Sequence, residues 1–95
     1  MAKFQSPPHD PAILAIQALV WALSDDARSQ RLLSLTGLTP DALRDGIGDA
    51  GLQGAVLAFL ESHEPDLIAC AVAIDVTPQS LVAARRALEG PNDYE

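Results

Sequence analysis

The sequence contains too little cysteine for a disulfide-linked protein and no apolar run long enough for a membrane-spanning one. Its single cysteine, Cys70, excludes an intrachain disulfide and favours a reducing compartment. The longest unbroken apolar run, residues 67–74, is far shorter than the ~20 residues of a membrane-spanning helix. Residues 1–10 lack the apolar segment of a signal peptide. We therefore expect a cytoplasmic protein that has no membrane partner.

Positive charge and aromatic side chains are also scarce. Six Lys and Arg residues stand against thirteen Asp and Glu, which gives a net charge of −7. Because phosphate backbones and anionic lipids attract basic surfaces, nucleic acid is an unfavoured partner. Aromatic residues make up 4% of the chain, whereas apolar residues make up 48% and are mostly Ala and Leu. This composition favours helix over sheet and predicts one small, acidic, all-α domain.

A helix stop followed at once by a helix start is the clearest local signal. Gly37 can take the left-handed conformation that ends a helix, while Thr39 can cap the next helix and Pro40 fits its first turn. The same signals return at Thr77 and Pro78. We expect a compact bundle of five or six helices in a domain spanning 10–90, between flexible tails at 1–9 and 91–95. The expected helices cover about 11–23, 25–36, 40–45, 50–62, 65–74 and 78–89.

The signals repeat at a constant offset of 38 residues, as in Thr39 with Thr77 and Leu43 with Leu81. Further matches fall at caps and core positions, where a repeated three-helix unit needs them. We expect two similar three-helix units in tandem. The alternative is that two helical triplets share common residue types by chance.

Each expected helix has an expected buried face. Ser24 is the expected cap of the second helix, and the helix over 65–74 is expected to be fully buried. The inward positions are Ile13, Ile16, Val20 and Leu23 in the first helix, Leu32, Leu33 and Leu35 in the second, Leu43 and Ile47 in or just after the third, and Leu81, Ala84 and Leu88 in the last.

The first helix is apolar nearly all round, so either the two halves wrap it or part of it stays exposed for a partner. We expect the wrapped arrangement and a monomer rather than a homodimer. Trp21 is the candidate contact if part of the helix stays exposed, because Trp is enriched where proteins meet.

No constellation of catalytic or metal-binding residues is present in the sequence. Cys70 has apolar neighbours, which indicates a buried structural thiol, and His63 has no second histidine at ligand spacing. Asp41, Asp45 and Asp49 lack the alternating acids and closing glutamate of a calcium loop. We therefore expect no catalytic residue, metal or cofactor, and Asp41 and Asp45 are candidate contacts for a basic partner.

The segment from Cys70 to Ala84 also has the spacing of a DNA-binding helix-turn-helix. Ala71 supplies the small residue where the helices cross, and Asp75 stands where the motif usually has glycine. The helix over 78–89 would be the recognition helix, with Arg85 and Arg86 as its only cations. The alternative is a helix pair that serves packing alone.

The segment from Leu33 to Arg44, with its Leu-Thr-Gly-Leu-Thr-Pro run, resembles a family of short bacterial proteins that is known only as a domain of unknown function. The resemblance extends from the first helix to the closing residues 83–88. It implies the helical fold and no activity. We therefore expect a small, non-enzymatic protein-interaction module. The alternative function is a DNA-binding regulator that uses the helix over 78–89.

Overall fold

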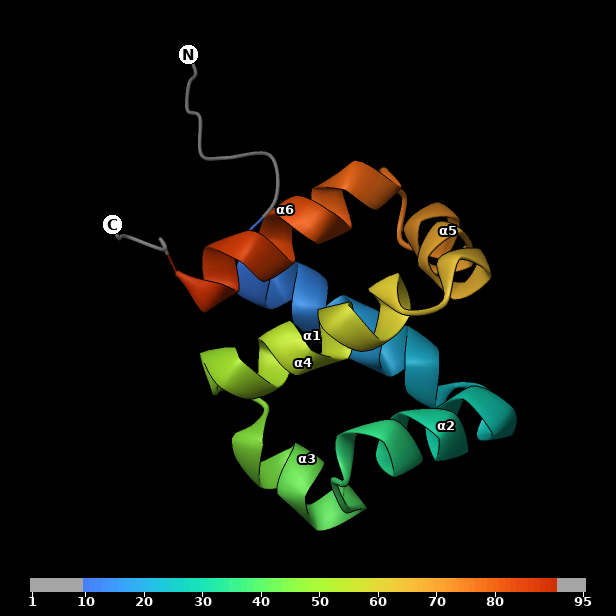
Figure 1. Ribbon diagram of the computed structural model, residues 1–95, viewed down its shortest axis with the longest axis vertical. Helices are drawn as coiled ribbons and strands as arrows, with labels where there is room; N and C mark the ends of the chain where they lie inside the picture. The colour runs from blue at the N-terminus through green and yellow to red at the C-terminus, as the bar shows by residue number, and fades with distance from the viewer. Residues whose placement is uncertain (1–9, 91–95) are drawn as a thin grey trace.

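The computed structural model describes residues 10–90, which form six α-helices and no strand. These are α1 (Pro11–Leu23), α2 (Asp26–Thr36), α3 (Pro40–Gly46), α4 (Ala50–Glu61), α5 (Glu64–Ala73) and α6 (Pro78–Glu89). The all-α prediction is confirmed. Figure 1 shows α4 crossing α1 at the centre of the bundle, with α6 and α2 packed on different sides of this pair. The tails expected at 1–9 and 91–95 lie outside the described residues.

Most predicted helix ends are confirmed by their capping contacts. Gly37 has φ of 73° and ends α2, and its N–H donates to the carbonyl of Leu33. The hydroxyls of Thr39 and Thr77 accept N–H groups three residues further on, both at 3.1 Å. The prediction for Ser24 is wrong, because Asp25 caps α2 while the Ser24 hydroxyl donates back to the Trp21 carbonyl at the end of α1.

The predicted inward face of α1 is wrong. The buried side chains of α1 are Leu14, Ala15, Ala18, Leu19 and Ala22. Ile13 and Val20 are 55% and 63% exposed, and Leu23 is also exposed. The reason is steric: Ala15, Ala18 and Ala22 allow α1 to pack closely on α4 and α6. The outer stripe of α1, formed by Ile13, Ile16, Val20 and Leu23, is therefore not wrapped by the other residues among 10–90, and Ile16 alone of the four is half-buried.

Two further burial predictions are also wrong. Helix α5 buries only one side, through Leu67, Cys70 and Ala71, whereas Ile68 and Val72 are exposed. Leu35 and Ile47, both expected to face inward, are 66% and 37% exposed. The buried hydrophobic residues form one core cluster. It includes Leu32, Leu43, Leu81 and Ala84, as predicted, and also the fully buried Leu57 and Leu60 of α4.

The 38-residue offset reappears in the starting residues of two of the three helix pairs, while α1 and α4 begin at residues 11 and 50, and it does not reappear in the packing. Helices α2 and α5 begin at residues 26 and 64, and α3 and α6 begin at residues 40 and 78. Helix α6 packs closely on both α1 and α4, whereas the seven-residue α3 has no comparably close helix neighbour within residues 10–90. Whether the halves are a tandem duplication stays a prediction.

Among the described residues, no single helix combines the length and hydropathy that crossing a bilayer requires. The α5–α6 pair, bent by 101°, reaches that length and composition when its two helices are counted together.

Candidate binding groove and its polar surroundings

An apolar groove runs along α4, between the end of α2 and the end of α3. It encloses about 680 Å³. We call it the α4 groove; its lining residues are Leu35, Thr36, Leu38, Gly46, Asp49, Leu52, Ala55, Ala58, Phe59 and Ser62. Its volume falls within the roughly 300–1,000 Å³ typical of ligand pockets. It is larger than the apolar hollow of about 280 Å³ that Leu23, Leu33 and Ile47 help to line.

Simple sequence features build the α4 groove. Leu52, Ala55, Phe59 and Ser62 are spaced so that they lie along one side of α4. The turn at Gly37 places Leu35 before it and Leu38 after it on the same wall. Gly46 lets the end of α3 approach α4, since a Cβ at that position would lie 2.9 Å from Cδ1 of Leu52. Gly46 therefore leaves room for the end of the Leu52 side chain in the groove.

The polar side chains of the lining are already bonded within the protein. The Thr36 hydroxyl donates to the Leu32 carbonyl at 2.7 Å, and the Ser62 hydroxyl donates to the Phe59 carbonyl at 2.6 Å. The Asp49 carboxylate accepts the N–H of Leu52 at 2.9 Å and so caps α4. No Arg, Lys or His lines the groove. The site can therefore bind an apolar surface, but it brings together no acid, base and nucleophile for a reaction.

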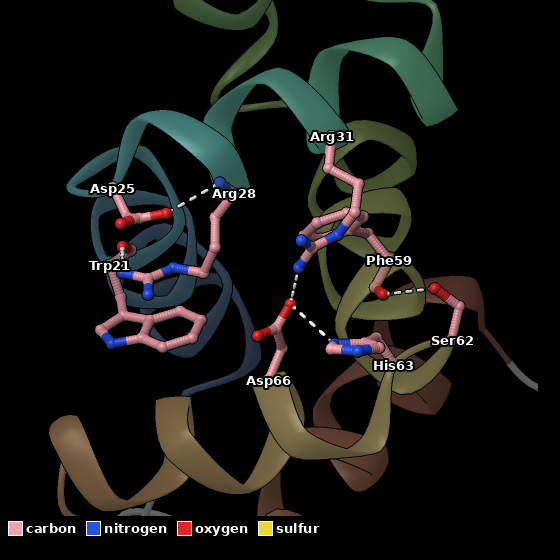
Figure 2. A network of polar contacts seen from close by, with 8 residues as sticks. All are labelled: Trp21, Asp25, Arg28, Arg31, Phe59, Ser62, His63 and Asp66. Carbon is pink, nitrogen blue, oxygen red and sulfur yellow. Dashed lines mark hydrogen bonds and ion pairs between the residues drawn. The ribbon is translucent and has the colours of Figure 1, made fainter.

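An ion-pair network lies beside the Phe59 wall of the groove (Figure 2). Arg31 of α2 pairs with Asp66 of α5, and Nδ1 of His63 lies 3.1 Å from the same carboxylate. The guanidinium carbon of Arg31 is 5.6 Å from the centre of the Phe59 ring. The network thus ties α2 and α5 across the end of α4, and Arg31 is directed toward Asp66 rather than toward a free ligand.

Trp21, a candidate partner contact, is half-buried and partly covered. The guanidinium carbon of Arg28 lies 3.7 Å from the centre of the indole ring, and the same guanidinium donates to the Trp21 carbonyl at 3.0 Å. Figure 2 shows the guanidinium lying above the ring. The indole therefore packs between α1 and Arg28 of α2. The most exposed apolar side chains of α1 are instead Ile13 and Val20.

The other four candidate contacts lie on two helices. Asp41 and Asp45 are exposed on α3, and Asp41 pairs with Arg44 at 3.1 Å. Arg85 of α6 pairs with Glu61 and also with Glu89, the latter at 2.7 Å. Its hydrogen bonds, first to Glu61 and then to Glu89, raise the pKa of Arg85. Arg86 is exposed and has no ion pair within residues 10–90. The five candidates therefore do not form one site.

Helices α5 and α6 have the geometry of a helix-turn-helix. They meet at 101°, within the usual range of about 90–120° for that motif. Asp75 in the turn has φ of 62°, the conformation that the motif gives to glycine, and Ala71 is fully buried where the helices cross. Cys70 beside it is buried as predicted, and burial raises the pKa of its thiol to about 11. Such a thiol is protonated at neutral pH and is a poor nucleophile.

Within residues 10–90, no three His, Cys, Asp or Glu side chains are grouped in a way that could hold a metal ion. The sequence reasoning did not find the α4 groove. The available signal was the pair of small residues Ala55 and Ala58 on one side of α4, together with Gly46 at the end of α3 and the leucines at 35 and 38 on either side of Gly37.

Comparison with known proteins shows the family of the chain. The family described as "Protein of unknown function (DUF3572)" matches residues 8–91, and the chain belongs to it. No curated protein and no solved structure matches the chain with significant similarity.

Proposed function

We propose that this member of the DUF3572 family is a non-enzymatic protein-interaction module of the cytoplasm, and that it binds its partner in the α4 groove. The observation that carries the proposal is the apolar groove of about 680 Å³, with Leu35 66% exposed on its wall. An exposed leucine beside a concave apolar surface costs free energy in water, and a partner that covers both recovers it. The single buried cysteine is compatible with a reducing compartment.

Two matched charge insertions test this proposal. Leu35→Glu places a carboxylate on the groove wall, and Val72→Glu places one on α5, where the valine is 76% exposed and outside the groove. Both variants should fold, because both native side chains are largely exposed. Quantitative affinity capture from cells should recover a partner with the native protein and with Val72→Glu. The amount of partner recovered with Leu35→Glu should be at least tenfold lower. Equal recovery by the two variants would contradict the proposal.

DNA binding is a second candidate, supported by the 101° crossing of α5 and α6 and by the conformation of Asp75. Arg85 already pairs with two acids, so Arg86 is the cation on α6 that this function would use. A gel shift at low salt, where phosphate attraction is strongest, is the appropriate test. This function predicts a shift that Arg86→Ala weakens, and the absence of any shift at low salt excludes it.

A further inference from the structure

We propose that the α4 groove takes one class of partner, a cationic amphipathic helix of another protein. This inference rests on the proposed function and specifies it. It follows from the shape of the groove floor, from the absence of a strand edge and from the distribution of charge on the described surface.

The floor of the groove fits a helix. Its residues along α4, from Leu52 to Ser62, extend over about 15 Å at 1.5 Å per residue, which is about three helical turns. Ala55 and Ala58 in the middle of the floor let a second helix approach closely. The backbone groups of α4 are bonded within the helix, and residues 10–90 contain no strand that could pair with an extended peptide. A bound segment must therefore satisfy its own backbone hydrogen bonds, as a helix does.

The charge distribution selects a cationic helix. Asp49 is the only ionisable residue of the lining, and the chain carries thirteen acids against six cations. Among the five described arginines, Arg31, Arg44 and Arg85 are held in ion pairs, Arg28 lies over Trp21, and Arg86 is exposed outside the groove lining. Exposed Asp45 directly precedes the lining residue Gly46. A helix with basic flanks would be attracted to this surface, whereas a fatty acid would bring a carboxylate to a groove that has no cation.

Three probes distinguish the possible occupants. The first is an 18-residue synthetic helix with leucines at i, i+3, i+4 and i+7 and lysines elsewhere on its surface. The second is the same peptide with every lysine replaced by glutamate, and the third is laurate. Backbone amide chemical shifts of the labelled full chain report binding. We expect the lysine peptide to shift the amides of Leu35, Ala55 and Phe59, with an affinity that falls at least fivefold between 50 and 300 mM salt.

A matched pair of substitutions locates the binding. Ala58 lines the groove and Ala69 lies on α5, and both alanines are exposed on helices. Ala58→Lys and Ala69→Lys change the net charge equally, so a difference between them reports position alone. The affinity of Ala58→Lys for the lysine peptide should be at least tenfold lower than that of Ala69→Lys.

Three outcomes would overturn the inference. They are equal binding of the two peptides, a groove that binds laurate but neither peptide, and equal affinities for the two lysine variants. If no peptide binds while Leu35→Glu still abolishes capture of a partner, the inference fails and the proposed function stands. If Leu35→Glu has no effect on capture, the proposed function itself fails.

Discussion

Asp75 is the residue whose backbone conformation is most at odds with its type. It is the one non-glycine residue among 10–90 with positive φ, at 62°, where the Cβ of an L-residue is crowded. Asp75→Gly should remove that strain and stabilise the protein by about 0.5–1 kcal/mol, equivalent to a few degrees in Tm. Asp75→Ala should melt below the glycine variant, because alanine retains the strain. A glycine variant that melts below the native protein would show that the turn is held by the aspartate.

Cys70 should make the folding stability of the protein fall at alkaline pH. Burial raises the pKa of its thiol to about 11, with Arg28 opposing this effect and Asp66 adding to it. An unfolded chain releases that proton near pH 9, whereas the folded protein keeps it to about pH 11. The folded state therefore binds more protons in this window, and its stability must fall as the pH rises from about 9 to 11.

The comparison of native protein with Cys70→Ala measures this effect. Urea midpoints taken from pH 7 to pH 11 should fall for the native protein, and the fall should be smaller for Cys70→Ala. The alanine variant serves as the control, since it keeps every other titrating group. Parallel curves for the two proteins would contradict the assignment of the alkaline loss to this thiol.

At the scale of helices, the caps could be predicted from sequence because each depends on neighbouring residues. Gly37, Thr39 and Thr77 take the roles that their residue types indicate. The choice between Ser24 and Asp25 failed because both residue types cap helices well. In the structure Ser24 caps the end of α1, and the adjacent Asp25 caps the start of α2.

Burial could be predicted less well, for a physical reason seen in α1. A helix that is apolar on every side carries no periodic signal for its inward face. The face that packs was selected by the fit of Ala15, Ala18 and Ala22 against other helices, which depends on tertiary structure. The α4 groove was missed for the same reason, because it is formed by residues of three segments that come together only in the folded protein.

The two threonine caps should differ in their effect on stability, although each accepts an N–H three residues further on; Thr77 also bonds the Ser80 hydroxyl at 2.9 Å. Thr39→Ala and Thr77→Ala each remove a hydroxyl that accepts an N–H at 3.1 Å, a loss of about 1 kcal/mol. Helix α6 packs closely on α1 and α4, so Thr77→Ala should lower the Tm of the whole protein. Helix α3 is short and packs weakly, so Thr39→Ala should mainly accelerate hydrogen exchange of the α3 amides. Equal losses in Tm would show that α3 unfolds together with the rest.

The molecule as a whole has an acidic surface with separate apolar areas. The α4 groove lies beside α2 and α3, whereas the exposed side chains of the outer stripe of α1 and of α5 lie outside that groove. Exposed apolar side chains that are scattered among polar ones are ordinary on protein surfaces. The α4 groove, at about 680 Å³, is larger than the apolar hollow of about 280 Å³ lined by Leu23, Leu33 and Ile47, and its size is the reason for placing the partner there.

The outer stripe of α1 raises the question of self-association, and we predict a monomer. Ile13, Val20 and Leu23 are only partly exposed, and together they offer much less than the roughly 800 Å² per partner of a standard stable interface. Pairing two copies also brings together two chains that each carry a net charge of −7. Sedimentation equilibrium over a dilution series should therefore give a monomer at both 50 and 500 mM salt, for the native protein and for Val20→Asp alike. A dimer that appears at high salt, where repulsion is screened, and that Val20→Asp abolishes would make this stripe an interface between copies of the chain.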